Sequence, residues 1–195
     1  MSDSRDSRKF GVQVVNVIGS GSLDVELDLE RLGHDIGEPI ARYDPDKYPG
    51  MYLRFSEDEP LITVYRTGKY IITGADSLEE SHVFRDRFLH LLSEMDAIDE
   101  AADEGFRIQN CVCTGDLQEN LNLNALTIAL GLEKTEYEPE QFPGLIYRPA
   151  SGDSVLLVFA TGKVVVTGAN TIEVAQSEFD AFRERLDSFL DQTDR

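Results

Sequence analysis

The sequence predicts an α+β fold in which one structural unit occurs twice, each copy being an antiparallel sheet with helices on one face. Two observations carry this prediction. The second half of the chain aligns with the first without a gap at every recognisable landmark. Each half also passes from an apolar run through short strand-like segments to one long segment with helical periodicity. We therefore expect one duplicated domain.

Two long motifs locate the repeat. YDPDKYPGMYLR at residues 43–54 aligns with YEPEQFPGLIYR at residues 137–148. TGKYIITGA at residues 67–75 aligns with TGKVVVTGA at residues 161–169. Because the identities cluster and keep their order, chance similarity does not explain them. We expect a polar arm at residues 1–10, a first repeat at residues 11–101 and a second at residues 106–195, joined by an acidic run into one domain.

The elements of the two halves follow in the same order. Each half has an apolar run (12–18; 107–113), a short amphipathic stretch (27–36; 121–130) and a long closing helix (77–98; 171–190). Three or four short strands lie between the last two, and they must be antiparallel because their connections are too short for a parallel crossover. Apolar side chains at helical spacing are expected in the core: Val83, Phe84, Phe88, Leu91, Leu92 and Met95, then Val174, Phe179, Phe182, Leu186, Phe189 and Leu190.

The strands are apolar on both faces, which is unusual for an antiparallel sheet with one face in water. Residues expected to face the helices are Val15, Val17, Ile62, Val64, Ile72, Leu156, Val158 and Val166. The opposite face would then hold Asn16, Ile18, Tyr65, Ile71, Thr73, Asn110, Val112, Leu157, Phe159, Val165 and Thr167. An exposed apolar face of that size predicts a binding surface. The alternative is that a second protein layer or a second copy of the chain covers it.

Composition excludes several classes of protein. No segment approaches the ~18 apolar residues of a membrane helix, and the first eleven residues do not form a secretory signal, so we expect a cytoplasmic protein. Cys111 and Cys113 are expected to be small buried residues, and no ligand set forms around them or the three histidines. We expect no metal, no other cofactor and no enzymatic activity, because no nucleophile or acid–base pair stands out.

Net charge is the strongest argument against nucleic-acid binding. The chain carries 37 acidic and 18 basic residues, for a net charge of −19. In molar salt, however, the Debye length is about 3 Å, and such acidity then serves solubility. We therefore hypothesise a salt-loving source for the protein.

The predicted outer face carries a set of polar groups that the repeat duplicates. Each half supplies one Asn, two aromatic rings (Tyr48 and Tyr65; Phe142 and Phe159), one Arg (Arg54; Arg148) and one Lys after Thr-Gly (Lys69; Lys163). Amide donors among apolar side chains suit the A·T minor groove, whose edges offer acceptors, while aromatic wedges unstack base steps and cations meet phosphates. The pattern therefore predicts minor-groove binding.

On these residues the chain resembles the TATA-box-binding protein family, in its archaeal branch, over residues 12–190. The resemblance implies a saddle: a curved antiparallel sheet of about ten strands, with four helices on its convex face and double-stranded TATA promoter DNA on its concave one. Implied DNA contacts are Asn16 and Asn110 at the centre, Tyr48, Tyr65, Phe142 and Phe159 as wedges, Ile18, Thr63, Ile71, Thr73, Val112, Leu157, Val165 and Thr167 along the groove, and Arg54, Thr67, Lys69, Arg148, Thr161 and Lys163 on the backbone.

The resemblance also implies partners. Tyr137, Glu138, Pro139, Glu140 and Gln141 would form the loop that transcription factor B grips, within a pre-initiation complex that contains RNA polymerase, in the nucleoid region of the cytoplasm. From the residues alone, the same segment is an acidic solvated turn. A homodimer of the free protein is compatible with DNA binding, and a sheet-mediated homodimer without a DNA role is the alternative function.

The first half departs from the family pattern at its wedges. Tyr48 and Tyr65 stand where the family has Phe, and Thr63 stands where it has a groove-lining Leu. A phenol inserted between base pairs must find a hydrogen-bond partner or lose on the order of 1 to 3 kcal/mol. We predict that the second half makes the consensus-like contacts, that the first half tolerates a different sequence, and that Tyr65→Phe tightens binding to a consensus TATA element.

Overall fold

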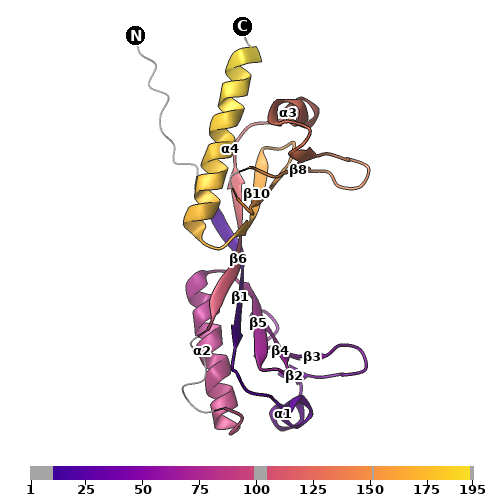
Figure 1. Ribbon diagram of the computed structural model, residues 1–195, viewed down its shortest axis with the longest axis vertical. Coiled ribbons are helices and arrows are strands. Elements are labelled where there is room, and N and C mark those ends of the chain that lie inside the picture. Colours follow the sequence, from indigo (N-terminus) through magenta and orange to yellow (C-terminus); the bar gives the residue numbers. More distant parts are fainter. Residues whose placement is uncertain (1–10, 99–104, 151, 194–195) are drawn as a thin grey trace. The chain divides into compact units, whose positions relative to one another are not determined.

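The computed structural model describes residues 11–98, 105–150 and 152–193, with side chains through Phe189 (Figure 1). The predicted polar arm at residues 1–10, residues 99–104 of the acidic join and the side chain of Leu190 lie outside the described residues. Contacts divide the chain into a first unit, residues 14–111, and a second unit, residues 112–195 together with the N-terminal segment. Each unit is described by itself.

In the first unit, four strands that are consecutive in the chain are also neighbours in the sheet. Its elements are β1 (Gln13–Ser22), α1 (Leu29–Ile36), β2 (Ala41–Arg42), β3 (Gly50–Leu53), β4 (Leu61–Tyr65), β5 (Lys69–Ala75) and α2 (Leu78–Glu94). The strand order is β2-β3-β4-β5-β1, and each strand pairs antiparallel with its neighbours in this order. The short connections therefore give the antiparallel neighbours that the sequence predicts.

The second unit repeats this arrangement. Its elements are β6 (Arg107–Asp116, whose first residues belong to the first unit), α3 (Leu123–Leu130), β7 (Thr135–Glu136), β8 (Leu145–Tyr147), β9 (Val155–Val158), β10 (Lys163–Ala169) and α4 (Ile172–Thr193). The strand order is β6-β10-β9-β8-β7. The described residues thus form ten strands and four helices in two tandem copies, which confirms the predicted fold class.

Helix starts coincide with side-chain caps. Asp28 accepts a hydrogen bond from the Arg31 N–H at the start of α1, and Asn122 accepts one from the Ala125 N–H at the start of α3. Ser77 caps α2 in the same way, as the predicted start at residue 77 requires. α2 ends at Glu94, four residues before the predicted end, and α4 extends to Thr193, beyond the predicted end at 190.

A helix covers one face of the strands in each unit (Figure 1). α2 buries Phe84, Phe88 and Leu92 in one cluster with Ile62 and Ile72 of the sheet. α4 buries Phe179, Phe182 and Leu186 in the second unit, where the rings of Phe182 and Tyr147 lie 5.9 Å apart. Burial of each such side chain stabilises the fold by about 1.5 to 3 kcal/mol.

The prediction of a core position is wrong for three residues. Val83 is 53% exposed and Val174 is 40% exposed, because the buried stripes of α2 and α4 run through the residues that follow each of them, Phe84 and Ala175. Val15 is 47% exposed, since the pairing of β1 with β5 begins only at Val17. Cys111 and Cys113 are free and buried, as expected.

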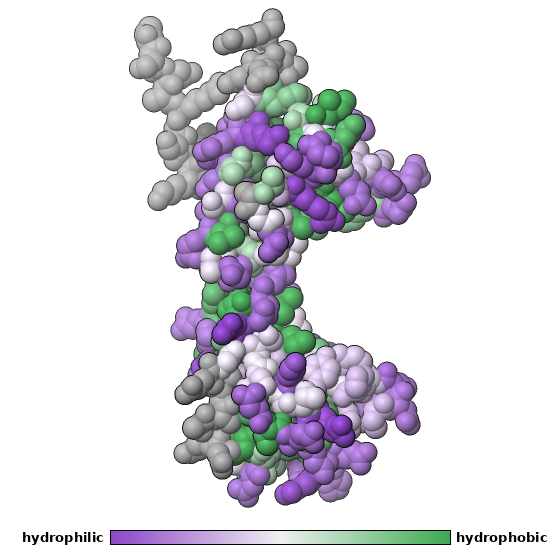
Figure 2. Space-filling model, in the orientation of Figure 1, coloured by the Kyte–Doolittle hydropathy of each residue, from purple (hydrophilic) through white to green (hydrophobic). Residues whose placement is uncertain are grey.

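Within the described residues, no helix combines the length and apolar character that crossing a membrane requires. Hydrophilic side chains cover much of the surface in view (Figure 2), in keeping with the net charge of −19.

Candidate nucleic-acid interface

Each unit has a sheet face that its own long helix leaves uncovered. On β5 and β10 the buried residues Ile72 and Val166 alternate with half-buried Ile71 and Val165, because successive side chains of a strand point to opposite faces. We call these uncovered faces the first and second outward faces. Cross-strand pairing extends each one into a row: Tyr52, Thr63, Ile71 and Ser20 in the first unit, and Ile146, Leu157 and Val165 in the second.

The residues predicted to contact DNA fall into two groups by exposure. Half-buried are Asn16, Ile18, Tyr48, Tyr65, Ile71, Thr73, Asn110, Val112, Phe142, Leu157, Phe159, Val165 and Thr167; exposed are Arg54, Thr67, Lys69, Arg148, Thr161 and Lys163. Thr63 differs from both groups because it is only 7% exposed. Its methyl group and the rings of Tyr48 and Tyr65 all lie close to Gly50, and little of Thr63 is exposed on the first outward face.

The Pro-Gly motif of each repeat positions one ring of the aromatic pair. The backbone N–H of Tyr48 donates to the Asp44 carbonyl at 3.0 Å, and that of Phe142 donates to the Glu138 carbonyl at 2.9 Å. The glycine that follows leaves room for the ring: a Cβ on Gly50 would lie 2.8 Å from the Tyr48 ring. The same distance, 2.8 Å, separates a Cβ on Gly144 from the Phe142 ring.

The two aromatic pairs have similar geometry. Ring centroids of Tyr48 and Tyr65 lie 6.2 Å apart with an interplanar angle of 59°. Those of Phe142 and Phe159 lie 5.8 Å apart at 65°. Each unit therefore presents a tilted pair of rings at one end of its outward face, at the positions that the repeat relates.

Hydroxyl groups distinguish the first pair from the second. The phenol oxygens of Tyr48 and Tyr65 lie 2.6 Å apart and share a hydrogen bond. This hydrogen bond, with a smaller effect of burial and of the neighbouring phenols, raises the pKa of Tyr65 above its ordinary value. The partner that the sequence argument required for each wedge hydroxyl is thus the other wedge.

A third ring, which the sequence analysis missed, joins this pair. Tyr52 stacks on Tyr48 with centroids 5.2 Å apart and an interplanar angle of 3°. Side chains two residues apart on a strand share a face, so Tyr52 lies on the same face of β3 as Gly50. This two-residue alternation could have predicted the position of Tyr52 from the sequence. We call Tyr48, Tyr52 and Tyr65 the tyrosine cluster.

The Asn16 side chain has a fixed orientation. Its Oδ1 accepts a hydrogen bond from the Gly74 N–H at 2.9 Å, and only the oxygen of the amide can accept. The Nδ2 group, with its two donors, is therefore directed to other partners. Asn110 occupies the related position on β6 and is also half-buried.

The Thr-Gly-Lys turns depend on their glycines. Gly68 and Gly162 have φ values of 78° and 84°, and each donates its N–H to the carbonyl of the wedge residue three positions earlier at 2.9 Å. A Cβ on Gly162 would lie 2.2 Å from the Glu119 carbonyl oxygen. The turn therefore sets where Thr161 and Lys163 stand at the edge of the face.

Cations line the edges of both outward faces. Lys69 and Lys163 are exposed, and among the described residues no side-chain ion pair within 4.0 Å is formed by either. Arg54 donates to the Glu57 carbonyl at 3.2 Å, and Arg148 lies 4.0 Å from the Glu136 carboxylate. All four side chains are thus placed at the surface.

At three related positions the first unit has a cation and the second has none. Arg42, Lys47 and Arg66 of the first unit align with Glu136, Gln141 and Ala160 of the second. Lys47 pairs with Asp44 at 2.6 Å, and their hydrogen bond lowers the pKa of Asp44 and raises that of Lys47. The two units therefore share the glycines and ring pairs that shape their outward faces, but they differ in charge at these three positions.

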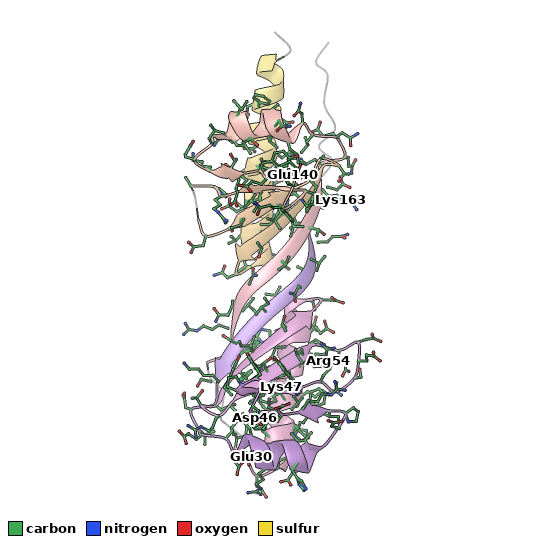
Figure 3. All side chains as sticks on the ribbon, turned by 90° about the vertical axis from the view of Figure 1, so that its right-hand side faces the viewer. Glu30, Asp46, Lys47, Arg54, Glu140 and Lys163 are labelled. Carbon is green, nitrogen blue, oxygen red and sulfur yellow. The ribbon has the colours of Figure 1, made fainter. Side chains whose placement is uncertain are left out.

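The segment assigned to transcription factor B forms the loop between β7 and β8. Tyr137 is half-buried, whereas Glu138, Pro139, Glu140 and Gln141 are exposed. Glu140 marks this loop in Figure 3. The Gln141 amide donates to the Glu138 carboxylate, and the Glu138 carbonyl accepts from two backbone N–H groups of the loop. The result is an ordered acidic turn.

Fold and faces together define a duplicated α+β binding protein. A family model described as "Transcription factor TFIID (or TATA-binding protein, TBP)" matches residues 11–95 and 105–189. The chain therefore belongs to the TATA-binding protein family of general transcription factors, whose members are DNA-binding proteins and not enzymes. The resemblance that the two repeated motifs indicated is confirmed.

Proteins from halophilic archaea are similar to this sequence over most of its length. The sequence is 50% identical over 179 residues to TATA-box-binding protein C of Halobacterium salinarum, covering 92% of this chain and 99% of the relative. It is 39% identical over 181 residues to TATA-box-binding protein 2 of Haloferax volcanii, covering 91% and 94%. The solved structure of Methanococcus jannaschii TBP matches with a TM-score of 0.79 at 35% identity, covering 91% of this chain and 99% of that one.

Proposed function

We propose that this chain binds the minor groove of TATA-box promoter DNA through its two outward faces, bends the duplex, and recruits transcription factor B and RNA polymerase. It would then act in the nucleoid region. The observation that carries the proposal is that both units repeat one cross-strand row on the uncovered face, one tilted ring pair and exposed cations at the edge. We propose that the repeats at residues 11–101 and 106–195 act as one DNA-binding domain.

Groove recognition would combine amide donors with apolar side chains. The Nδ2 donors of Asn16 match the purine N3 and thymine O2 acceptors of A·T pairs, and Asn110 would do the same from the second repeat. The half-buried rows through Ile71 and Val165 would press on the groove floor. A guanine amino group would be desolvated there without a partner, so the second row in particular favours A·T pairs.

Bending would come from the ring pairs. Phe142 and Phe159 present hydrocarbon edges that can enter a base step, and partial unstacking opens the minor groove toward the protein. The cations and threonines beside the turns, Arg54, Thr67, Lys69, Arg148, Thr161 and Lys163, would contact phosphates on either side. Apolar burial would then supply most of the affinity of a protein with this net charge.

Recruitment of transcription factor B would use the acidic loop of the second unit. Exposed Glu138 and Glu140 offer negative charge on an ordered turn, which complements a basic partner surface. The related loop of the first unit carries Lys47, paired with Asp44, where the second has Gln141. The two loops thus differ in charge, and the second is the more acidic.

Fluorescence anisotropy with a TATA duplex and a G/C-scrambled duplex, in molar KCl, tests the proposal. Val165→Glu places a carboxylate on the second outward face and should weaken TATA binding at least tenfold. Val83→Glu adds the same charge at an exposed position of α2 and should leave affinity unchanged. Equal affinity for both duplexes, or no effect of Val165→Glu, would contradict it.

Sedimentation of the free protein separates the alternative function. A homodimer that dissociates when the TATA duplex is added is consistent with the proposal. A tight dimer that binds no duplex at any salt concentration would instead favour a sheet-mediated interaction protein.

A further inference from the structure

The two outward faces differ in the number of hydroxyl groups that they carry. At three related positions the first unit has Tyr48, Tyr52 and Tyr65, whereas the second has Phe142, Ile146 and Phe159. Backbone geometry and ring tilt are nearly the same in the two pairs. The difference between the faces at this end is therefore mainly the presence of hydroxyl groups.

Two of the hydroxyls form one polar group. The Tyr48 and Tyr65 oxygens lie 2.6 Å apart, and stacking on Tyr52 restrains the Tyr48 ring. Each hydroxyl has one donor and two acceptor lone pairs, and their mutual bond uses one donor and one lone pair. The joined pair keeps a further donor and spare acceptor capacity. Both rings are half-buried, so the pair forms part of the first outward face.

Minor-groove chemistry gives that spare acceptor capacity a specific use. The A·T edge shows only acceptors, whereas a G·C pair adds the 2-amino donor of guanine. Against the hydrocarbon of Phe142 and Phe159 this amino group loses its water without replacement, which costs binding energy. Against phenol oxygens the amino group can donate a hydrogen bond.

We propose that the first outward face accepts a purine with a 2-amino group, as in a G·C pair, at the base step that Tyr48 and Tyr65 enter, with a phenol oxygen accepting the amino hydrogen bond. This inference rests on the proposed function and adds its sequence specificity. The second face excludes the same pair. The two ends of the binding site therefore differ in base preference, and the difference fixes the direction in which the chain lies on the duplex.

Single-atom changes in the duplex test this proposal. 2,6-Diaminopurine adds the 2-amino group to an A·T pair, and inosine removes it from a G·C pair, with little other change in the groove. A TATA duplex carrying diaminopurine at one end should bind the protein within threefold of the unmodified duplex, or more tightly. The same duplex should bind Tyr48→Phe/Tyr65→Phe about tenfold more weakly than the unmodified one.

Orientation is the second readout. A cleavage reagent attached at Asp46→Cys, or at the repeat-related Glu140→Cys, reports which unit lies at the modified end, and the native cysteines are buried. We expect the first unit at the diaminopurine end in at least nine of ten complexes, and no preference for the double variant. A duplex with a G·C pair in place of the diaminopurine pair should show the same preference, and inosine in place of that guanine should abolish it. Tyr43→Phe removes a phenol outside the tyrosine cluster and should behave like the unchanged protein.

Three results would overturn the inference. If the unchanged protein binds unmodified TATA DNA but discriminates tenfold against diaminopurine at both ends, the proposed function stands and the inference fails. If the double variant tolerates diaminopurine as well as the unchanged protein does, the phenols are not the cause. If no duplex binds at any salt concentration, the proposed function fails and the inference with it. Thermal melts of each variant establish that it is folded.

Discussion

The Thr-Gly-Lys turn gives the sharpest test of how the repeat is built. Gly162 has a φ of 84°, and a Cβ there would lie 2.2 Å from the Glu119 carbonyl oxygen. The substitution Gly162→Ala must therefore strain the turn and displace the connection that follows β6. That connection is held by two hydrogen bonds to the turn, each 2.9 Å long, from the N–H groups of Leu117 and Leu121.

Summing these effects gives the expected loss of stability. A left-handed conformation costs a residue with a Cβ about 1 to 2 kcal/mol. Loss of two hydrogen bonds costs roughly 0.5 to 1.5 kcal/mol each. Gly162→Ala should therefore lower the free energy of unfolding by about 2 to 5 kcal/mol and the Tm by roughly 4 to 20 °C.

Urea unfolding in molar KCl, followed by circular dichroism, measures the effect. Gly68→Ala in the first repeat should cost about as much, because its Cβ would lie 2.3 Å from the Val25 carbonyl oxygen. Gly33→Ala is the matched control: Gly33 is helical and a Cβ there meets only ordinary contacts, at 3.5 Å from Tyr43. It should raise stability by about 0.5 to 1 kcal/mol. A Gly162→Ala protein within 0.5 kcal/mol of the unchanged one would refute the reasoning.

Three further predictions concern the interface. Asn16→Asp keeps an acceptor for the backbone but removes the amide donors and adds charge, so TATA affinity should fall at least tenfold while the unfolding free energy changes by less than about 0.5 kcal/mol; unchanged affinity would count against the groove role. The pKa of Tyr65 is raised, so its contribution to stability should be present below pH 10 and lost as the pH rises through its folded pKa. Absorbance titration should show one tyrosine ionising late, and Tyr48→Phe should return it to the ordinary range; a late tyrosine that persists in the variant would refute the hydrogen-bond explanation. Glu138→Lys/Glu140→Lys should abolish the supershift by transcription factor B without weakening binding of the TATA duplex alone, and an intact supershift would exclude this loop as the contact.

Duplication made the fold predictable from the sequence. Each turn, strand and helix signal occurs twice, so a weak pattern in one half is checked by the other. The PG and TGK motifs, whose glycines allow ring packing and a left-handed turn, fixed where the hairpins lie. The order of elements and the position of the uncovered faces follow from these signals together with alternation along the strands.

The sequence could not predict which residues of a helix face the core, or any detail that depends on side-chain conformation. Val83 and Val174 are apolar and close to the helical spacing, yet each lies one residue away from the buried stripe. Thr63 lies in the cross-strand row of the first outward face, yet it is only 7% exposed, which the sequence pattern did not indicate. The hydrogen bond between Tyr48 and Tyr65 requires knowledge of both side-chain conformations, which no sequence pattern gives.

Affinity for a TATA duplex, titrated from low to molar KCl, tests the central claim most directly. Ordinary DNA-binding proteins release counterions and bind more weakly as salt rises. With a net charge of −19 and an interface dominated by apolar burial, this chain should bind the TATA duplex more tightly as KCl increases, and more tightly than a scrambled duplex throughout the binding range. A steep fall in affinity with KCl would contradict the salt-adapted, apolar mode of binding, and no preference for the TATA duplex at any concentration would contradict the function itself.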